Sequence, residues 1–494
     1  MEQLTQGRRP GAVFAVTALG AFMASLDLSI VNVAFPALAR SFPTEGRAAL
    51  AWVITSYTIV FAALLVTAGR TADRLGRRRV FSTGLVVFCV GSALCGVAPS
   101  LGLLVGGRVV QGVGAALLLP SSLGLLLEAF PASARSTAVA LWGGVGALAV
   151  ATGPTLGAAL VTAGGWRWAF FVNLPVGLVA GVGGRLWVPG TPPSAGAGRP
   201  DPLGVGLVTL ALAGVVLAIS EGPAWGWTDP WVVGALVVSA AAGAGFVRRC
   251  SRHPEPVLDL SLFRSRAFSL ANAATVSYAM GFFAMLLGNI LFLTGVWHYS
   301  ILRAGLAVTP GPLVVAAVSG PAGRLAGRVG FSRVLLAGFA VFAAGLAWYA
   351  TRAGATPDYV RLWLPGTLVT GLGIGLTFPV LSAAAVSDLP PDRFALGSAV
   401  NQTSRQVGGA IGIAVLVAIL GPSASAASSG ATPGAVADFH AMWAFAATAA
   451  LAAGALAAGI GGLRRPPLPA VTGPEPGAGA VAAAAAGGIG QERR

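Results

Sequence analysis

The chain contains no lysine, only three cysteines and three histidines, and few charged residues of either sign. Charged residues make up 10% of its 494 positions, whereas about 25% is usual in soluble globular domains. Cys89, Cys95 and Cys250 form no metal-binding or redox spacing. The histidines fall in or near predicted loops, His440 included, so neither a histidine relay nor a metal site is predicted. A phosphate-cradling Gly-Lys-Ser/Thr loop is also missing, which argues against an ATP-driven machine.

Apolar residues dominate what remains. They account for 55% of the chain, with a mean hydropathy of +0.80, and seventy glycines suit helices that pack closely in lipid. The net charge of +15 is spread over short loops between apolar runs. This distribution favours contact with anionic headgroups and a role in topology over nucleic-acid binding. The sequence therefore predicts a membrane protein without a nucleic-acid partner.

The apolar residues fall into fourteen runs, each about as long as a membrane span. These runs are 12–35, 50–68, 80–98, 103–127, 137–163, 168–188, 203–220, 231–247, 270–294, 305–322, 332–350, 361–386, 402–420 and 441–463. An even number places both termini on one side. With a cytoplasmic N-terminus, the inner segments carry about four times as many arginines as the outer loops, as the positive-inside rule requires. We expect a multi-pass protein of the inner (plasma) membrane with both termini cytoplasmic.

Residues 69–81 form a dense group of arginines between the second and third runs. The pattern Gly-x-x-x-Asp-Arg-x-Gly-Arg-Arg resembles the signature loop between the second and third helices of major facilitator superfamily transporters. The resemblance implies a gate with Asp73 at a helix N-terminus, stabilised by the helix dipole and nearby arginines. Topology alone would also explain the arginines. The candidate gating residues are Gly69, Asp73, Arg74, Gly76, Arg77 and Arg78. Residues 320–330 repeat the glycine and arginine spacing without the aspartate.

Asp27 lies well inside the first apolar run, where an ionisable residue is costly and is a functional candidate by default. Desolvation favours the neutral acid, so this carboxyl could load and release a proton near neutral pH. A structural hydrogen bond to a neighbouring helix is the alternative. Residues 26–36, with Asn32 as a second candidate, resemble the first-helix motif of the fourteen-span QacA/EmrB-type drug:proton antiporters. In that family the acid is linked to proton or substrate handling.

Arg108 lies near the start of the fourth run, and a buried arginine needs an anionic or carbonyl partner. Its segment, with Gln111 and Gly112, resembles the superfamily's fourth-helix motif, whose arginine is associated with proton transfer. The resemblance implies that Arg108 modulates proton binding by Asp27. A structural arginine that caps a neighbouring helix is the alternative.

The fifth run contains Gly153, Pro154 and Gly157, in which proline kinks the helix and glycine allows close approach of a partner. The pattern resembles the antiporter motif Gly-x-x-x-Gly-Pro-x-x-Gly-Gly, which implies export. Ala149 and Ala158 replace two of its glycines, but both are small enough to preserve the packing.

In the second half, residues 401–409 also look typical of the family. Asn401 and Arg405 are further candidates there, and we expect the segment to pack at an inner helix end. Aromatic side chains in this half could supply apolar contacts to a substrate or could face lipid. These residues are Phe282, Phe283, Trp297 and Phe378.

The resemblance covers nearly all of residues 12–463 and implies an all-α major facilitator fold, with two six-helix bundles and two extra central helices. The predicted order is a cytoplasmic N-terminus (1–11), a six-helix bundle (12–188), a cytoplasmic linker (189–202), two extra spans (203–247), a cytoplasmic loop (248–269), a second bundle (270–463) and a disordered cytoplasmic tail (464–494).

The predicted function is proton-coupled export of a lipophilic small molecule, a drug or an antibiotic, by alternating access. The expected partners are the lipid bilayer, the substrate and protons, with no cofactor, and the expected unit is a monomer. The rivals are a membrane-embedded enzyme and a non-transporting sensor on the same fold. An enzyme would need clustered polar catalytic residues at one membrane face, and the sequence shows no such cluster.

Overall fold

The computed structural model describes residues 10–190, 201–254, 256–389, 394–421 and 433–460. The predicted tail, the start of the chain and most of the linker lie outside these residues. So do the side chains of Asp73 and of several residues in 132–151. Every regular element in the described part of the chain is helical.

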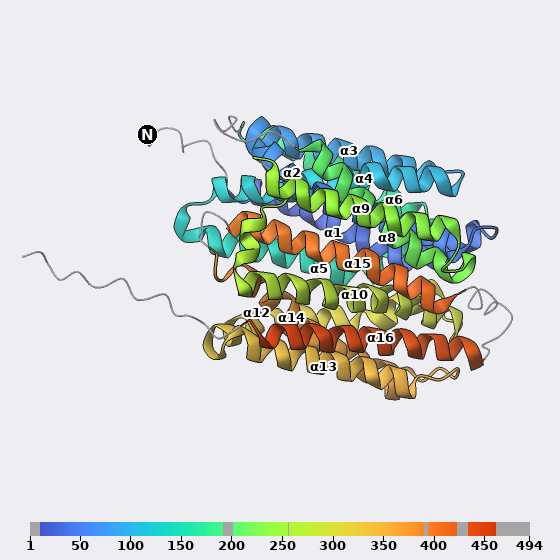
Figure 1. Ribbon diagram of the computed structural model, residues 1–494. Coiled ribbons are helices and arrows are strands. Elements are labelled where there is room, and N and C mark those ends of the chain that lie inside the picture. Colours follow the sequence, from blue (N-terminus) through green and yellow to red (C-terminus); the bar gives the residue numbers. More distant parts are fainter. Residues whose placement is uncertain (1–9, 191–200, 255, 390–393, 422–432, 461–494) are drawn as a thin grey trace, which may run out of the picture. The chain divides into compact units, whose positions relative to one another are not determined.

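The helices fall into three consecutive groups (Figure 1). The first group is α1 (Pro10–Ser41), α2 (Arg47–Leu75), α3 (Arg77–Val97), α4 (Leu101–Ala129), α5 (Ala132–Gly164), α6 (Trp168–Phe171) and α7 (Asn173–Trp187). The middle group is α8 (Pro202–Trp225), α9 (Pro230–Arg252) and the short η2 (Leu260–Arg264). The last group is α10 (Arg266–Gly295), α11 (Ile301–Val308), α12 (Pro310–Val329), α13 (Phe331–Arg352), η3 (Tyr359–Trp363), α14 (Leu364–Val386), α15 (Phe394–Leu420) and α16 (Pro433–Ala458).

Thirteen helical stretches among the described residues are long and apolar enough to cross a bilayer. The continuous pairs α6–α7, α11–α12 and η3–α14 each count as one stretch. The prediction of an all-α membrane protein is confirmed. The count of fourteen spans stays a prediction. Its remaining member would be α5, a helix of 33 residues packed against α1.

Several helices begin with a side-chain cap. Ser100 accepts a hydrogen bond from the Leu103 amide, and Asp229 accepts one from the Trp231 amide at 2.8 Å. Such caps satisfy amides that have no partner within the helix. They allow short connections between long apolar helices.

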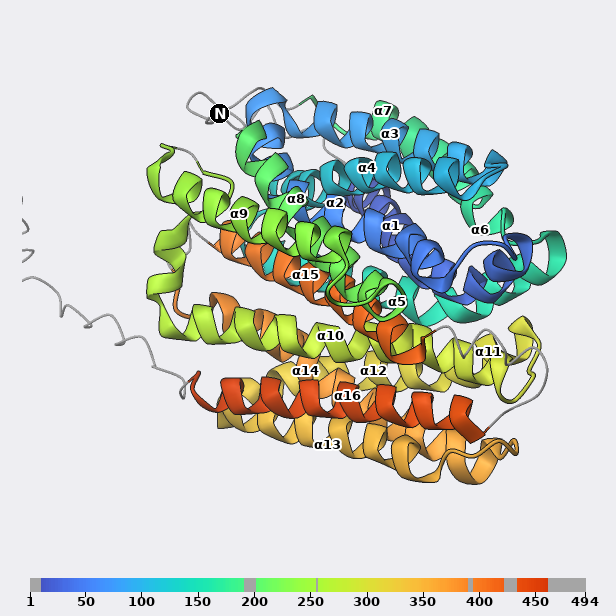
Figure 2. The same cartoon turned by 45° about the vertical axis from the view of Figure 1, so that its right-hand side comes forward.

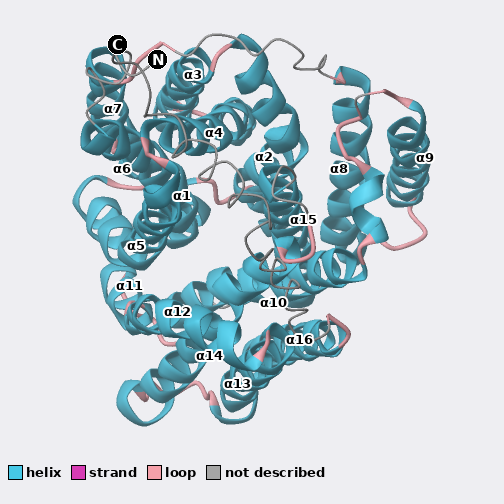
Figure 3. Cartoon of the chain, turned by 90° about the vertical axis from the view of Figure 1, so that its left-hand side faces the viewer, coloured by secondary structure: helices cyan, strands magenta, loops and turns pink. Residues whose placement is uncertain are grey.

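Viewed nearly end-on, α8 lies beside α2 and α15, and α9 lies on its outer side (Figure 3). Ile59 of α2, Val216 of α8 and Ala410 of α15 share one apolar cluster. Only 17% of the apolar window of α9 is buried, against 67% for α1. The predicted extra pair therefore contacts helices of both halves through α8 and exposes α9. Figure 2 shows the same pair from another side.

The predicted loop over residues 69–81 is wrong in its extent, because α2 continues to Leu75 and α3 begins at Arg77. The turn is Gly76 alone, whose φ of 93° favours glycine. Asp73 consequently lies in the last turn of α2. The predicted place of Asp73 at a helix N-terminus is wrong. Gly330, between α12 and α13, has φ 96°, so the two repeated segments turn in the same way.

The last helix also begins before the last predicted run, 441–463. Helix α16 begins at Pro433, which places His440 inside a helix and not in a loop. Its Nε2 lies 2.6 Å from the Ala353 carbonyl oxygen. Among the described residues no group of histidines, cysteines and acids could hold a metal ion.

Candidate functional site

Asp27 lies at the centre of a polar cluster to which five helices of the first half contribute. Its side chain, from the middle of α1, is fully buried and so is that of Arg108 from α4. Gln111 of α4, Ser92 of α3 and Asn173 of α7 complete the cluster of side chains, and α2 adds a backbone carbonyl. We call these five side chains the Asp27 cluster. The sequence-predicted pair therefore meets in space.

Each carboxylate oxygen of Asp27 accepts hydrogen bonds. Oδ2 accepts from Arg108 Nη1 at 2.5 Å, and Oδ1 accepts from Gln111 Nε2 at 2.7 Å and from Asn173 Nδ2 at 3.1 Å. Ser92 Oγ lies 2.7 Å from the same Gln111 nitrogen and 3.0 Å from the Asn173 nitrogen. All three groups around the carboxylate are donors, so both of its oxygens have hydrogen-bond partners.

The guanidinium of Arg108 is held on several sides. Nε donates to the Val53 carbonyl of α2 at 2.7 Å, and Nη1 also reaches Gln111 Oε1 at 2.6 Å. The Cζ atom lies 4.2 Å from the centroid of the Tyr57 ring, a cation–π contact. An ion pair buried in apolar surroundings is tolerable only with such additional partners. The predicted need of Arg108 for an anionic or carbonyl partner is confirmed.

Gly112 explains how α4 can bring Arg108 so close to α2. A Cβ atom at this position would lie 2.9 Å from the Tyr57 carbonyl oxygen, so a side chain would push the helices apart. One turn earlier on the same face, Arg108 reaches Val53. The motif glycine thus positions the arginine.

Sequence reasoning missed Asn173, Ser92 and Tyr57. Each is a neutral polar residue within an apolar run. That location was the only feature of the sequence that could have indicated them. Asn32, which was predicted as a candidate, does not join the Asp27 cluster through any hydrogen bond in the described residues. Its Nδ2 donates to the Leu28 carbonyl of its own helix at 2.6 Å.

The candidate gating residues lie near one end of α2 and α3, away from the Asp27 cluster. Arg77 pairs with Glu128 of α4 at 2.9 Å, and Arg78 donates to the Arg185 carbonyl at 2.9 Å. Arg74 is exposed. A Cβ on Gly69 would meet only Pro120, at an ordinary 3.6 Å. The described contacts join this turn to α4 and α7 of its own half.

The antiporter-motif residues of α5 face α1. A Cβ on Gly153 would lie 2.4 Å from Ser29 Cβ, and one on Gly157 would lie 3.1 Å from Ile30 Cα. Pro154 lies inside α5 without ending it. The next residue, Thr155, shares a 2.6 Å hydrogen bond with Thr309 at the start of α12. The motif therefore packs against α1 directly beside a contact with the second half.

The expected position of Asn401 and Arg405 at a helix end is wrong. Helix α15 begins at Phe394 and continues through the polar residues before the predicted run. Asn401 Nδ2 donates to Thr275 of α10 at 2.8 Å. Arg405 lies eleven residues after Phe394, the first residue of α15. At 1.5 Å per residue, this places it about 16 Å from the start of the helix.

The aromatic residues of the second half pack inside the protein. Phe283 and Trp297 are buried. Phe282 and Phe378 are half-buried, with their ring centroids 5.1 Å apart. Burial therefore keeps the rings of Phe283 and Trp297 largely away from lipid.

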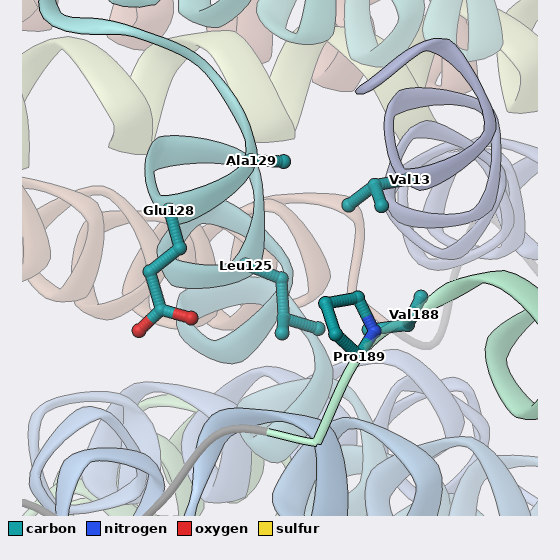
Figure 4. Close-up of a pocket in the computed structure, with 6 residues that line it drawn as sticks. All are labelled: Val13, Leu125, Glu128, Ala129, Val188 and Pro189. Atoms are coloured by element: carbon teal, nitrogen blue, oxygen red, sulfur yellow. The ribbon is translucent and has the colours of Figure 1, made fainter. Parts of the chain in front are cut away.

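A small pocket lies elsewhere, where the ends of α1 and α4 meet the residues after α7 (Figure 4). Val13, Leu125, Ala129, Val188 and Pro189 give it an apolar lining, together with Glu128. The carboxylate of Glu128 points away from Val13 and Pro189, consistent with its pairing elsewhere. This pocket is separate from the Asp27 cluster.

The family model described as Major Facilitator Superfamily matches residues 17–413. The chain belongs to the major facilitator superfamily. Multidrug resistance protein Stp of Mycobacterium tuberculosis is 35% identical over 396 residues, which cover 80% of this chain and 73% of that protein. The tetracenomycin C resistance and export protein of Streptomyces glaucescens is 32% identical, over 82% of this chain and 74% of that protein.

Solved structures show the same fold. The crystal structure of an auto-inhibited POT family peptide transporter superposes with a TM-score of 0.65 and 18% identity, over 91% of this chain and 96% of that one. The predicted major facilitator fold is confirmed, and the protein is a multi-pass membrane transporter of this superfamily.

Proposed function

We propose that this major facilitator transporter exports lipophilic small molecules, such as drugs or antibiotics, in exchange for protons. Export is supported by relatives whose names record multidrug resistance, or resistance to and export of tetracenomycin C. The proposed location is the inner (plasma) membrane with both termini cytoplasmic. The proposed driving force is the proton gradient without a cofactor, and the proposed unit is a single chain that carries both halves.

The observation that carries proton coupling is the carboxylate of Asp27, fully buried among three donors. A proton on either carboxylate oxygen removes the negative charge that Arg108 pairs with. Arg108 keeps its bonds to Val53 and Gln111, so α4 stays attached to α2 while α1 loses its strongest tie. Protonation thereby changes which arrangement of α1 is stable, as a coupling ion must.

The test is transport in inverted membrane vesicles with a lipophilic fluorescent dye. The Asp27→Asn variant should lower the initial rate of proton-driven dye uptake at least tenfold, while exchange of dye down its own gradient continues. Thr17→Val is the control, because its buried hydroxyl donates only to carbonyls of its own helix α1. Proton-driven transport at the wild-type rate in Asp27→Asn would show that Asp27 is not the coupling residue.

A membrane-embedded enzyme is the alternative of a different class. It would need a polar catalytic group at a membrane face, whereas the Asp27 cluster lies deep within apolar helices. The relatives of this chain are major facilitator transporters. Both observations favour transport.

A further inference from the structure

Arg405 is a cation deep in the second half, and the described residues give it no acidic partner. Helices α10 to α15 contain no aspartate or glutamate. The ion pairs found among the described residues involve Arg77, Arg108 and Arg249. An arginine at this depth is expensive and normally marks a partner or a ligand.

The protein supplies Arg405 with two uncharged partners. Its Nη2 donates to Gln402 Oε1, one turn earlier on α15, and its Cζ lies 5.3 Å from the centroid of the Phe378 ring on α14. A guanidinium has five N–H donors in a planar fork that matches a carboxylate. Most of this donor capacity is therefore available to a ligand.

The surface next to Arg405 is aromatic. Phe378 lies 5.2 Å from the Tyr278 ring and 5.1 Å from the Phe282 ring, both at steep interplanar angles. Thr377 donates to the Tyr278 hydroxyl at 2.9 Å and anchors that ring. Phe282, Phe378, Gln402 and Arg405 are all half-buried, so each side chain keeps part of its surface accessible. Edge-to-face rings of this kind suit a planar aromatic guest.

We propose that Arg405, Gln402, Phe378 and Phe282 bind aromatic substrates that carry one negative charge, such as a carboxylate or a phenolate. The guanidinium pairs with the anionic group, and the two phenylalanines contact the ring system. This inference rests on the proposed export of lipophilic small molecules and names their class. The first half then handles the proton at Asp27, and the second half handles an anion at Arg405.

Binding to two probes with the same ring system tests this assignment. The full chain in phosphatidylcholine nanodiscs is titrated with 1-pyrenebutyrate and with its neutral amide, without a proton gradient, and the signal of empty nanodiscs is subtracted. The wild type should prefer the carboxylate at least tenfold. Arg405→Gln should bring the two dissociation constants within twofold of each other, and Arg405→Lys should retain part of the preference. Phe378→Ala should weaken both probes by a similar factor.

Unchanged amide binding shows that Arg405→Gln is folded. Arg333→Gln is the matched control, because Arg333 is an exposed side chain on α13. The proposal is overturned if the wild type has no preference for the carboxylate, or if Arg405→Gln retains it. Loss of the preference when phosphatidylglycerol is added would instead assign Arg405 to a lipid headgroup. Because no gradient is used, a failure of proton coupling at Asp27 would leave this result unaffected.

Discussion

The ion pair between Asp27 and Arg108 has no access to water, with both side chains at 0% exposure. Removal of one member of such a pair leaves an uncompensated charge in a low-dielectric interior, which costs about 3–5 kcal/mol. Removal of both charges is far less damaging. Stability and proton coupling should therefore respond differently to single and double substitutions.

We expect Arg108→Gln alone to destabilise the protein strongly, because it leaves the Asp27 carboxylate buried with only neutral donors. The double variant Asp27→Asn/Arg108→Gln should recover most of the thermal stability, since no charge remains in the cluster. It should still lack proton-driven transport. Thermal unfolding in detergent and vesicle transport measure the two effects. A double variant as unstable as Arg108→Gln would contradict the role of the charge pair.

Gln111 links the acid and the arginine, because its Nε2 donates to Asp27 while its Oε1 accepts from Arg108. Gln111→Leu keeps a similar volume and leaves both groups one hydrogen bond short, which should cost about 1–3 kcal/mol. We expect a lower melting temperature and a reduced rate of proton-driven transport. Gln111→Glu should be worse still, since it places a second acid beside Asp27. Wild-type transport in Gln111→Leu would remove this residue from the mechanism.

At the scale of elements, the contact of α5 with α1 depends on clearance at particular positions. Gly153→Ala would place its Cβ within 2.4 Å of Ser29 Cβ, whereas Gly146→Ala, two turns earlier on the same helix, would meet Ser25 Oγ at 3.5 Å. We expect Gly153→Ala to lower the melting temperature and the transport rate, because α5 must move away from α1. Gly146→Ala should behave as the wild type or be slightly more stable, as alanine favours helix. Equal behaviour of the two variants would contradict this packing.

The predictions from the sequence succeeded for buried charges and failed for neutral polar residues and for the start of one helix. Asp27 and Arg108 were predictable because a charge inside an apolar run is costly without a partner. Asn173 and Ser92 were not predictable, since a neutral polar side chain can form hydrogen bonds with its own helix as well as with a neighbouring helix. Arg405 was predicted at a helix end because polar residues precede it. Tertiary packing against α10 and α2 extends the helix through them.

The predicted position of Asp73 at a helix N-terminus was wrong for a related reason. A cluster of charged residues predicts a loop. Helix α2 nevertheless continues through these residues and ends before Gly76, whose backbone conformation interrupts the helix. Charge shows where a chain leaves the membrane. It does not show where a helix stops.

At the scale of the whole molecule, the hydrogen bond between Thr155 and Thr309 joins α5 to the start of α12. Alternating access requires such contacts between the halves to break in one state. We expect the Thr155→Cys/Thr309→Cys variant, in a chain without its three native cysteines, to cross-link on oxidation and to lose at least nine-tenths of its transport. A reductant should restore it.

Each single cysteine variant is the control and should be insensitive to the oxidant. Cross-linking is followed by gel mobility after proteolytic cleavage between the halves. A fully cross-linked protein that transports at the wild-type rate would mean that this contact persists throughout the cycle.

The complete burial of the Asp27–Arg108 pair affects how the protein responds to the membrane voltage. In the deprotonated cluster the two charges cancel, so the electric field does little net work on this part of the molecule when it rearranges. A proton on Asp27 leaves the cluster with one positive charge. Full passage of one charge through the field releases about 2.3 kcal/mol per 100 mV. The voltage would therefore drive the proton-loaded form inward and leave the return of the empty form almost voltage-independent.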